Sequence, residues 1–138
     1  MLVVVVIADM TVHFGENSER LESDIIAKFK AAFGGVGRLI ANGASLLRLG
    51  QRNSMSALFL CENGTGLKNL DNVYNSGKML SMLEEIFTNL FQSDNPQVMV
   101  HIKKVVWEPA DHHRCSSHFK PLPTSEFIIY GHIVYLGL

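Results

Sequence analysis

The chain opens on a run of β-branched apolar residues. Leu2 to Ile7 consists almost entirely of Val and Ile, which favours a strand, and an unbroken apolar run is typical of a strand covered on both faces. Polar residues then alternate through Asp9, Thr11 and His13 before a turn at Gly15-Glu16-Asn17. We therefore expect the strand to leave the core at its carboxyl end, with these polar residues on one face.

Two later stretches carry apolar residues at helical spacing. The first predicts a helix that Asn17 or Ser18 caps and that Gly34-Gly35 ends, because glycine adopts the left-handed cap without a steric cost. The second predicts one long helix that begins at about Asn69 and ends at Phe91, before Asp94-Asn95-Pro96.

The remaining apolar segments are predicted to be strands, and Val98–Trp107 alternates clearly between apolar and polar residues. They are Val36–Leu49 with an interruption at Asn42-Gly43, Ser54–Glu62, Val98–Trp107 and Phe127–Leu136. A loop rich in proline and histidine, Glu108–Glu126, precedes the last strand.

This order predicts a single α/β (α+β) domain over residues 1–138. Two β-α-β units, residues 1–50 and 54–107, form one mixed sheet with both helices on one face, and residues 108–138 add a loop and a C-terminal strand. Two helices cannot cover both faces, so we expect further copies of the chain to cover the other. The last strand suits pairing with a neighbour's sheet edge, and deletion of Ser125–Leu138 is expected to break the oligomer.

Composition narrows the class of protein. Of 138 residues, 47% are hydrophobic and 18% are charged, which is enough apolar material for a folded core. The net charge of -1 shows no excess of basic residues, which a nucleic-acid-binding protein would usually have. The longest apolar run, Met1–Ala8, is shorter than the roughly 20 residues of a membrane span, and it has no features of a secretion signal. We expect a cytoplasmic protein that does not bind membranes.

Three candidate sites for chemistry fall short of known patterns. The loop Glu62–Gly66 lacks the glycine spacing of nucleotide-binding loops, which predicts a flexible turn and no cofactor. The segment Asp111–His118 gathers metal-capable side chains, but the spacing of Cys115 and His118 does not match zinc sites, so a solvated loop without metal is expected, and metal binding through these two residues is the alternative. Cys61 lies in an apolar strand and is interpreted as a buried thiol.

Three segments resemble one known family. They are Ala57–Leu60 with the loop Gly64-Thr65-Gly66, Asn75–Leu80, and Pro96 before Val98–Ile102. Together with the order of elements and the length, they look like the tautomerase superfamily, in its macrophage migration inhibitory factor and 5-carboxymethyl-2-hydroxymuconate isomerase branches. The resemblance implies a homotrimer with a proline at the mature N-terminus acting as base.

The sequence departs from that family at the catalytic position, because it begins Met1-Leu2. The first hypothesis is therefore a tautomerase-like oligomer that serves as a binding or structural subunit. The second is an active isomerase of a small enolic or keto acid, with the Met1 amine or His13 as base and with Arg38, Arg48 and Arg52 as candidates for binding an acidic substrate. The third is an adaptor domain of the roadblock or longin type, which works through other proteins.

Overall fold

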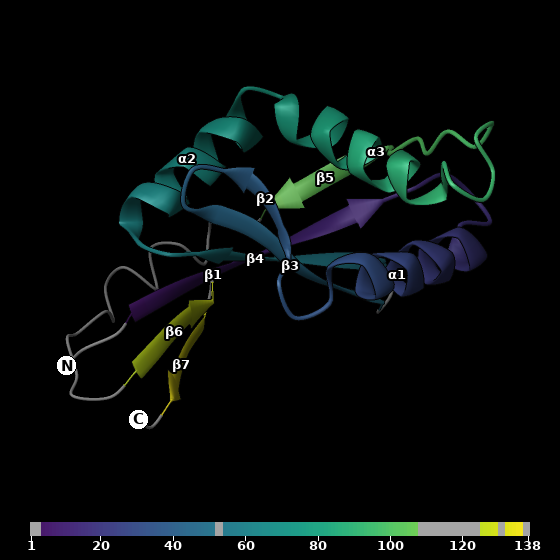
Figure 1. Ribbon diagram of the computed structural model, residues 1–138. Coiled ribbons are helices and arrows are strands. Elements are labelled where there is room, and N and C mark those ends of the chain that lie inside the picture. Colours follow the sequence, from purple (N-terminus) through teal and green to yellow (C-terminus); the bar gives the residue numbers. More distant parts are fainter. Residues whose placement is uncertain (1–3, 52–53, 108–124, 130–131, 137–138) are drawn as a thin grey trace.

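Ten elements follow the order β-α-β-β-β-α-α-β-β-β in the part of the chain that the structure describes (Figure 1). The computed structural model describes residues 4–51, 54–107, 125–129 and 132–136. The strands are β1 (Val4–His13), β2 (Arg38–Ala41), β3 (Ala44–Gln51), β4 (Met55–Cys61), β5 (Lys104–Trp107), β6 (Ser125–Ile129) and β7 (His132–Leu136). The helices are α1 (Glu19–Phe33), α2 (Gly64–Asn75) and α3 (Lys78–Phe91). Within the described ranges, no helix has the length and apolar character of a membrane span.

Strand β1 lies in the middle of the sheet. One of its edges pairs antiparallel with β4, and β3 and β2 follow outward, each antiparallel to its neighbour. The other edge is shared, because β5 pairs antiparallel with residues 10–13 of β1 and β6 pairs parallel with residues 4–7. Strand β7 pairs with β6, and the two form a hairpin away from the helices (Figure 1).

The sheet consists of two interleaved β-α-β units. Strands β1 and β3 run parallel with β4 between them, and α1 connects them through β2. Strands β4 and β5 run parallel with β1 between them, and α2 and α3 connect them. This split β-α-β topology is that of ferredoxin-like folds. It confirms the predicted α+β class, although each unit holds a strand of the other.

All three helices lie on one face of the sheet. Alternate residues of the central strands face them and are buried, while their neighbours are half-buried. Helices α1 and α3 pack side by side, and α2 precedes α3 along the same side (Figure 1). The largest fully buried side chains come from both layers: Phe29, Phe59, Phe87, Met10 and Ile25. Burial of one such side chain contributes about 1.5–3 kcal/mol.

The predicted long helix is two helices. Ser76 ends α2, with its N–H bonded to the Asn72 carbonyl at 3.0 Å, and Gly77 has a φ of 81°. A left-handed residue cannot continue a right-handed helix, so α3 starts anew at Lys78. The two helices can therefore follow the curved sheet in different directions.

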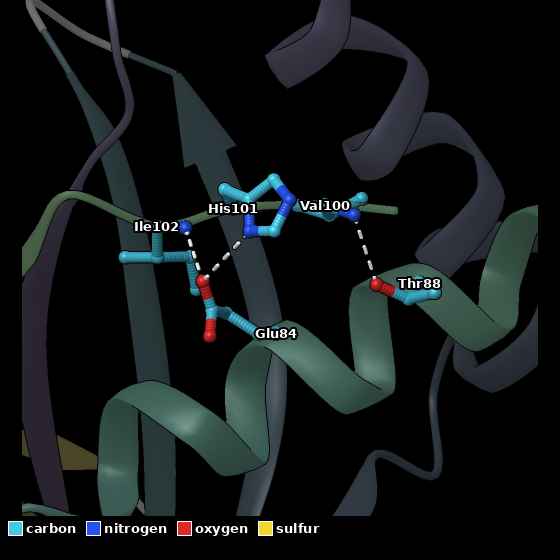
Figure 2. Close-up of polar contacts among 5 residues, drawn as sticks. All are labelled: Glu84, Thr88, Val100, His101 and Ile102. Atoms are coloured by element: carbon cyan, nitrogen blue, oxygen red, sulfur yellow. Dashed lines mark hydrogen bonds and ion pairs between the residues drawn. The ribbon is translucent and has the colours of Figure 1, made fainter. Parts of the chain in front are cut away.

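The predicted strand Val98–Trp107 is shorter than expected, because only β5 joins the sheet. The preceding residues run along α3, and side chains of that helix accept their backbone N–H groups (Figure 2). Thr88 Oγ1 accepts from Val100 at 2.9 Å, and Glu84 Oε2 accepts from Ile102 at 2.7 Å. Val100 and Ile102 are buried, whereas Met99 and His101 are exposed. Buried and exposed residues alternate along this segment as they do in a strand, but its backbone N–H groups bond to side chains of a helix and not to a neighbouring strand.

Of two turns predicted from the sequence, the structure confirms one and corrects the other. The interruption at Asn42-Gly43 is confirmed as the turn between β2 and β3, with Gly43 at a φ of 81°. The loop Glu62–Gly66 is not a flexible turn, because α2 begins at Gly64. Asn63 caps that helix, and its Oδ1 accepts from the Gly66 N–H at 2.9 Å. The main chain of Gly66 also lies against the Gly43 turn.

Candidate functional site

His13, the predicted base, lies where β1 ends. Its Nδ1 is 3.3 Å from the Ser54 hydroxyl, which immediately precedes β4. The loop between β1 and α1 and the first turn of α1 complete a polar hollow of about 640 Å³ beside it. The lining residues are His13, Phe14, Gly15, Glu16, Asn17, Ser18, Glu19, Arg20, Glu22 and Ser54.

A buried carboxylate, Glu22, forms one wall of this hollow. Glu22 is 5% exposed, and its Oε2 accepts from the Gln51 amide at 3.1 Å while its Oε1 accepts from the Ser18 hydroxyl at 3.4 Å. The Gln51 amide also reaches the Glu19 carbonyl, at 3.4 Å. Buried polar groups need such partners. The network joins the start of α1 to the end of β3, and it is a structural connection that the sequence analysis missed.

The charge around His13 has the wrong sign for an acidic substrate. Glu16, Glu19 and Glu22 line the hollow against a single cation, Arg20. A keto acid carries a carboxylate, and like charges at close range disfavour binding. Among the described residues no group of three metal-ligating side chains is assembled.

Arg38, a predicted substrate-binding residue, lies beside the other end of α1. It borders a hollow of about 510 Å³ between α1 and α3, whose lining includes Phe33, Ile86 and Leu90. The Arg38 guanidinium donates to the Leu39 carbonyl at 3.1 Å. Lys28 lines the same hollow, but its ammonium is 2.6 Å from the Asp94 carboxylate and is thus neutralised.

Arg48 lies on the opposite side of α1. It lines a second hollow, of about 660 Å³, between α1 and β3, together with Lys30 and an apolar floor that includes Ile26, Phe29 and Leu49. Val36, in the turn that follows α1, is 83% exposed, and Leu39, on the edge strand β2, is 60% exposed. The sequence analysis placed Val36 at the start of a strand, whereas the structure places it before β2.

The structure thus separates the predicted site residues instead of gathering them. His13 stands at the start of α1 and Arg38 follows its end, so the 15-residue helix puts roughly 20 Å between them. Arg48 is nearer to His13, because it registers through Leu58 with Asp9, roughly 13 Å before His13 along β1. Met1, Arg52 and the segment Asp111–His118, with Cys115, lie outside the described residues.

Cys61 is buried against the helices, as the sequence predicts. Burial raises the pKa of its thiol from 9.0 to about 12, because the low-dielectric surroundings disfavour the thiolate. The thiolate is the nucleophilic form, so Cys61 contributes packing and not covalent chemistry near neutral pH.

Comparisons of the chain with models of protein families, with curated proteins and with solved structures each yield no match. The interpretation therefore depends on the geometry of this chain, and its fold by itself does not specify a function.

Proposed function

We propose that the domain is a binding or structural subunit of a homo-oligomer, tautomerase-like in its architecture but without that family's chemistry. The observation that carries the proposal is the separation of His13 from Arg38 by the length of α1, while Arg48 lies two strands away from β1, in register with Asp9. General acid–base catalysis needs the base within about 3 Å of the proton that it removes. A small keto acid held by Arg38 would lie far outside that range.

Two further features support a binding role. Val36, in the turn after α1, and Leu39, on the edge strand β2, are exposed next to cationic residues, and an exposed strand edge can pair with another chain. The Glu-lined surroundings of His13 oppose the anionic substrates that the active-isomerase alternative requires.

An activity assay separates the binding role from catalysis. Purified protein is incubated with pyruvate and phenylpyruvate, and enol–keto exchange is followed by proton–deuterium exchange in NMR. We expect no rate above buffer with the wild type. A rate above buffer that disappears in a His13→Ala variant would overturn the proposal in favour of an isomerase.

The solution mass tests the oligomer. We expect light scattering to give three times the chain mass of 15.4 kDa at micromolar concentration. A mass equal to one chain at every concentration would contradict a homo-oligomer. It would instead favour the adaptor alternative, in which the exposed edge strand β2 binds a different protein.

A further inference from the structure

Three cations with no counter-charge border the exposed apolar residues at the end of α1. Lys30, Arg38 and Arg48 are exposed, and no described acidic side chain forms an ion pair with any of them. Val36 and Leu39, close to Lys30 and Arg38 in the chain, are exposed as well. We call these five residues the basic edge. Such a surface, which combines exposed apolar side chains with cations, suits a partner that carries carboxylates beside an accessible recess.

The same chain carries a surface of that kind at the other end of α1. Glu16 and Glu19 are exposed at the polar hollow beside His13, and the buried Glu22 adds its charge. We call these three residues the acidic corner. Its hollow, of about 640 Å³, is large enough to receive side chains of a partner.

Stabilisation of α1 explains only part of this charge separation. Acidic residues in the first turn and a basic residue in the last turn complement the helix dipole, which accounts for Glu19, Glu22 and Lys30. Glu16 precedes the helix, and Arg38 and Arg48 lie on β2 and β3. The helix dipole stabilises these three charges only weakly. Even so, the acidic one lies before the start of α1, and the two basic ones lie on strands beside its second half and its end.

We propose that copies of this chain associate head to tail, with the basic edge of one copy against the acidic corner of the next. This inference rests on the proposed homo-oligomer and specifies its interface. Contact between two different surfaces is heterologous, so it closes into a ring when the rotation between neighbours divides a full turn. Three copies related by 120° satisfy that condition. Burial of Val36 and Leu39 supplies apolar area, and the charges set the orientation.

Charge reversal at one end tests this arrangement. In one variant Glu16→Lys and Glu19→Lys reverse the acidic corner, and in another Arg38→Glu and Arg48→Glu reverse the basic edge. Like charges then face each other at every contact, and we expect association to weaken on the order of 100-fold, to monomers. The matched control, Lys68→Glu with Glu85→Lys, changes exposed charges on α2 and α3 that belong to neither surface, and it keeps the wild-type mass.

A mixture of the two variants and a fourfold variant test whether the two surfaces contact each other. An equimolar mixture restores complementary charge at both kinds of contact, because the unchanged basic edge of one variant faces the unchanged acidic corner of the other, and the two reversed surfaces also carry opposite charges. The mixture is expected to form hetero-oligomers that contain both variants, whereas neither variant associates alone. A chain with all four reversals has complementary ends again and is expected to recover the wild-type mass. Circular dichroism and melting temperature confirm folding, and the single changes Glu16→Lys and Arg38→Glu replace any variant that fails to fold.

The outcomes separate the two proposals. A wild-type oligomer that both reversals leave intact would overturn the head-to-tail interface and leave the homo-oligomer standing. Reversed variants that dissociate but do not associate with each other on mixing would also overturn the interface. A monomeric wild type overturns both. Dissociation of each variant, formation of hetero-oligomers on mixing and recovery in the fourfold variant together support the inference.

Discussion

Glu84 supplies to Ile102 the acceptor that a neighbouring strand would otherwise give. Its Oε2 accepts the Ile102 N–H at 2.7 Å and lies 3.9 Å from His101 Nδ1, as Figure 2 shows. Thr88, one turn later on α3, accepts the backbone N–H of Val100 in the same way. These side chains fix the segment 98–102 on the helix, so that Val100 and Ile102 reach the core.

Replacement of Glu84 tests the contribution of that acceptor. We expect Glu84→Ala to lower the free energy of unfolding by about 1.5–3 kcal/mol, because a hydrogen bond to a charged group is lost at a partly buried amide. Amide exchange at Ile102 should rise with it. The control is Glu85→Ala, at the exposed next position, which should change stability by less than about 0.5 kcal/mol. Equal urea midpoints for the two variants would contradict this role.

Cys61 gives a second prediction at the residue scale. In a Cys115→Ser background, alkylation of Cys61 by iodoacetamide at pH 8 should be about 1,000-fold slower in the folded protein than in urea, because the thiol pKa rises from 9.0 to about 12. The raised pKa also stabilises the fold below pH 9, and that stability should be lost as the pH rises from 9 towards 12. Equal alkylation rates with and without urea would show that the thiol is accessible.

At the scale of elements, the start of α2 is set by contact with a distant turn. A Cβ on Gly66 would lie 2.1 Å from the Gly43 carbonyl oxygen, and Gly43 has a left-handed φ of 81°. Asn63 caps the same helix end. Two glycines thus allow the β2–β3 hairpin and α2 to approach more closely than any side chain would permit.

The two glycines at the start of α2 provide a matched pair. Gly66→Ala forces main chain apart and should destabilise the protein by about 1–3 kcal/mol. Gly64→Ala meets nothing within 4 Å and should be neutral or stabilising by up to about 1 kcal/mol, since alanine favours a helix. Thermal melts of both variants measure this difference. A Gly66→Ala protein as stable as Gly64→Ala would show that the β2–β3 hairpin can move away from α2 without loss of stability.

At the scale of the whole molecule, interleaving makes the two β-α-β units inseparable. Strand β1 belongs to the first unit, yet it holds β4 and β5 of the second on its two edges. The C-terminal strand was expected to suit a neighbour's sheet edge, but β6 pairs with residues 4–7 of its own chain. The outer edges on this side belong to β7 and, beside residues 10–13 of β1, to β5.

This pairing changes what a truncation is expected to do. Deletion of Ser125–Leu138 exposes the edge of β1 over residues 4–7, so the midpoint of urea unfolding should fall. The head-to-tail contact involves the two ends of α1, and the oligomer mass should therefore survive. Light scattering and urea titration of the truncated chain measure both quantities, and a monomeric but folded product would place the interface at the C-terminal hairpin instead.

Periodicity and turn residues along the chain were enough to predict the α+β class, the helices on one face, the β2–β3 turn and the burial of Cys61. These are local properties, because alternation and helical stripes record which side of an element faces the core. Gly77 carried a local signal for the break between α2 and α3, but the continuous apolar stripe around it outweighed that signal in the sequence prediction.

The sequence by itself thus determined which residues are apolar, where the elements lie and which faces are buried. Only the tertiary structure decided that β1 enters between β4 and β5, that α3 holds segment 98–102, and that His13 stands at the opposite end of α1 from Arg38. Each depends on residues far apart in the chain. Their distances are set by the packing of whole elements, which no local pattern of residues encodes.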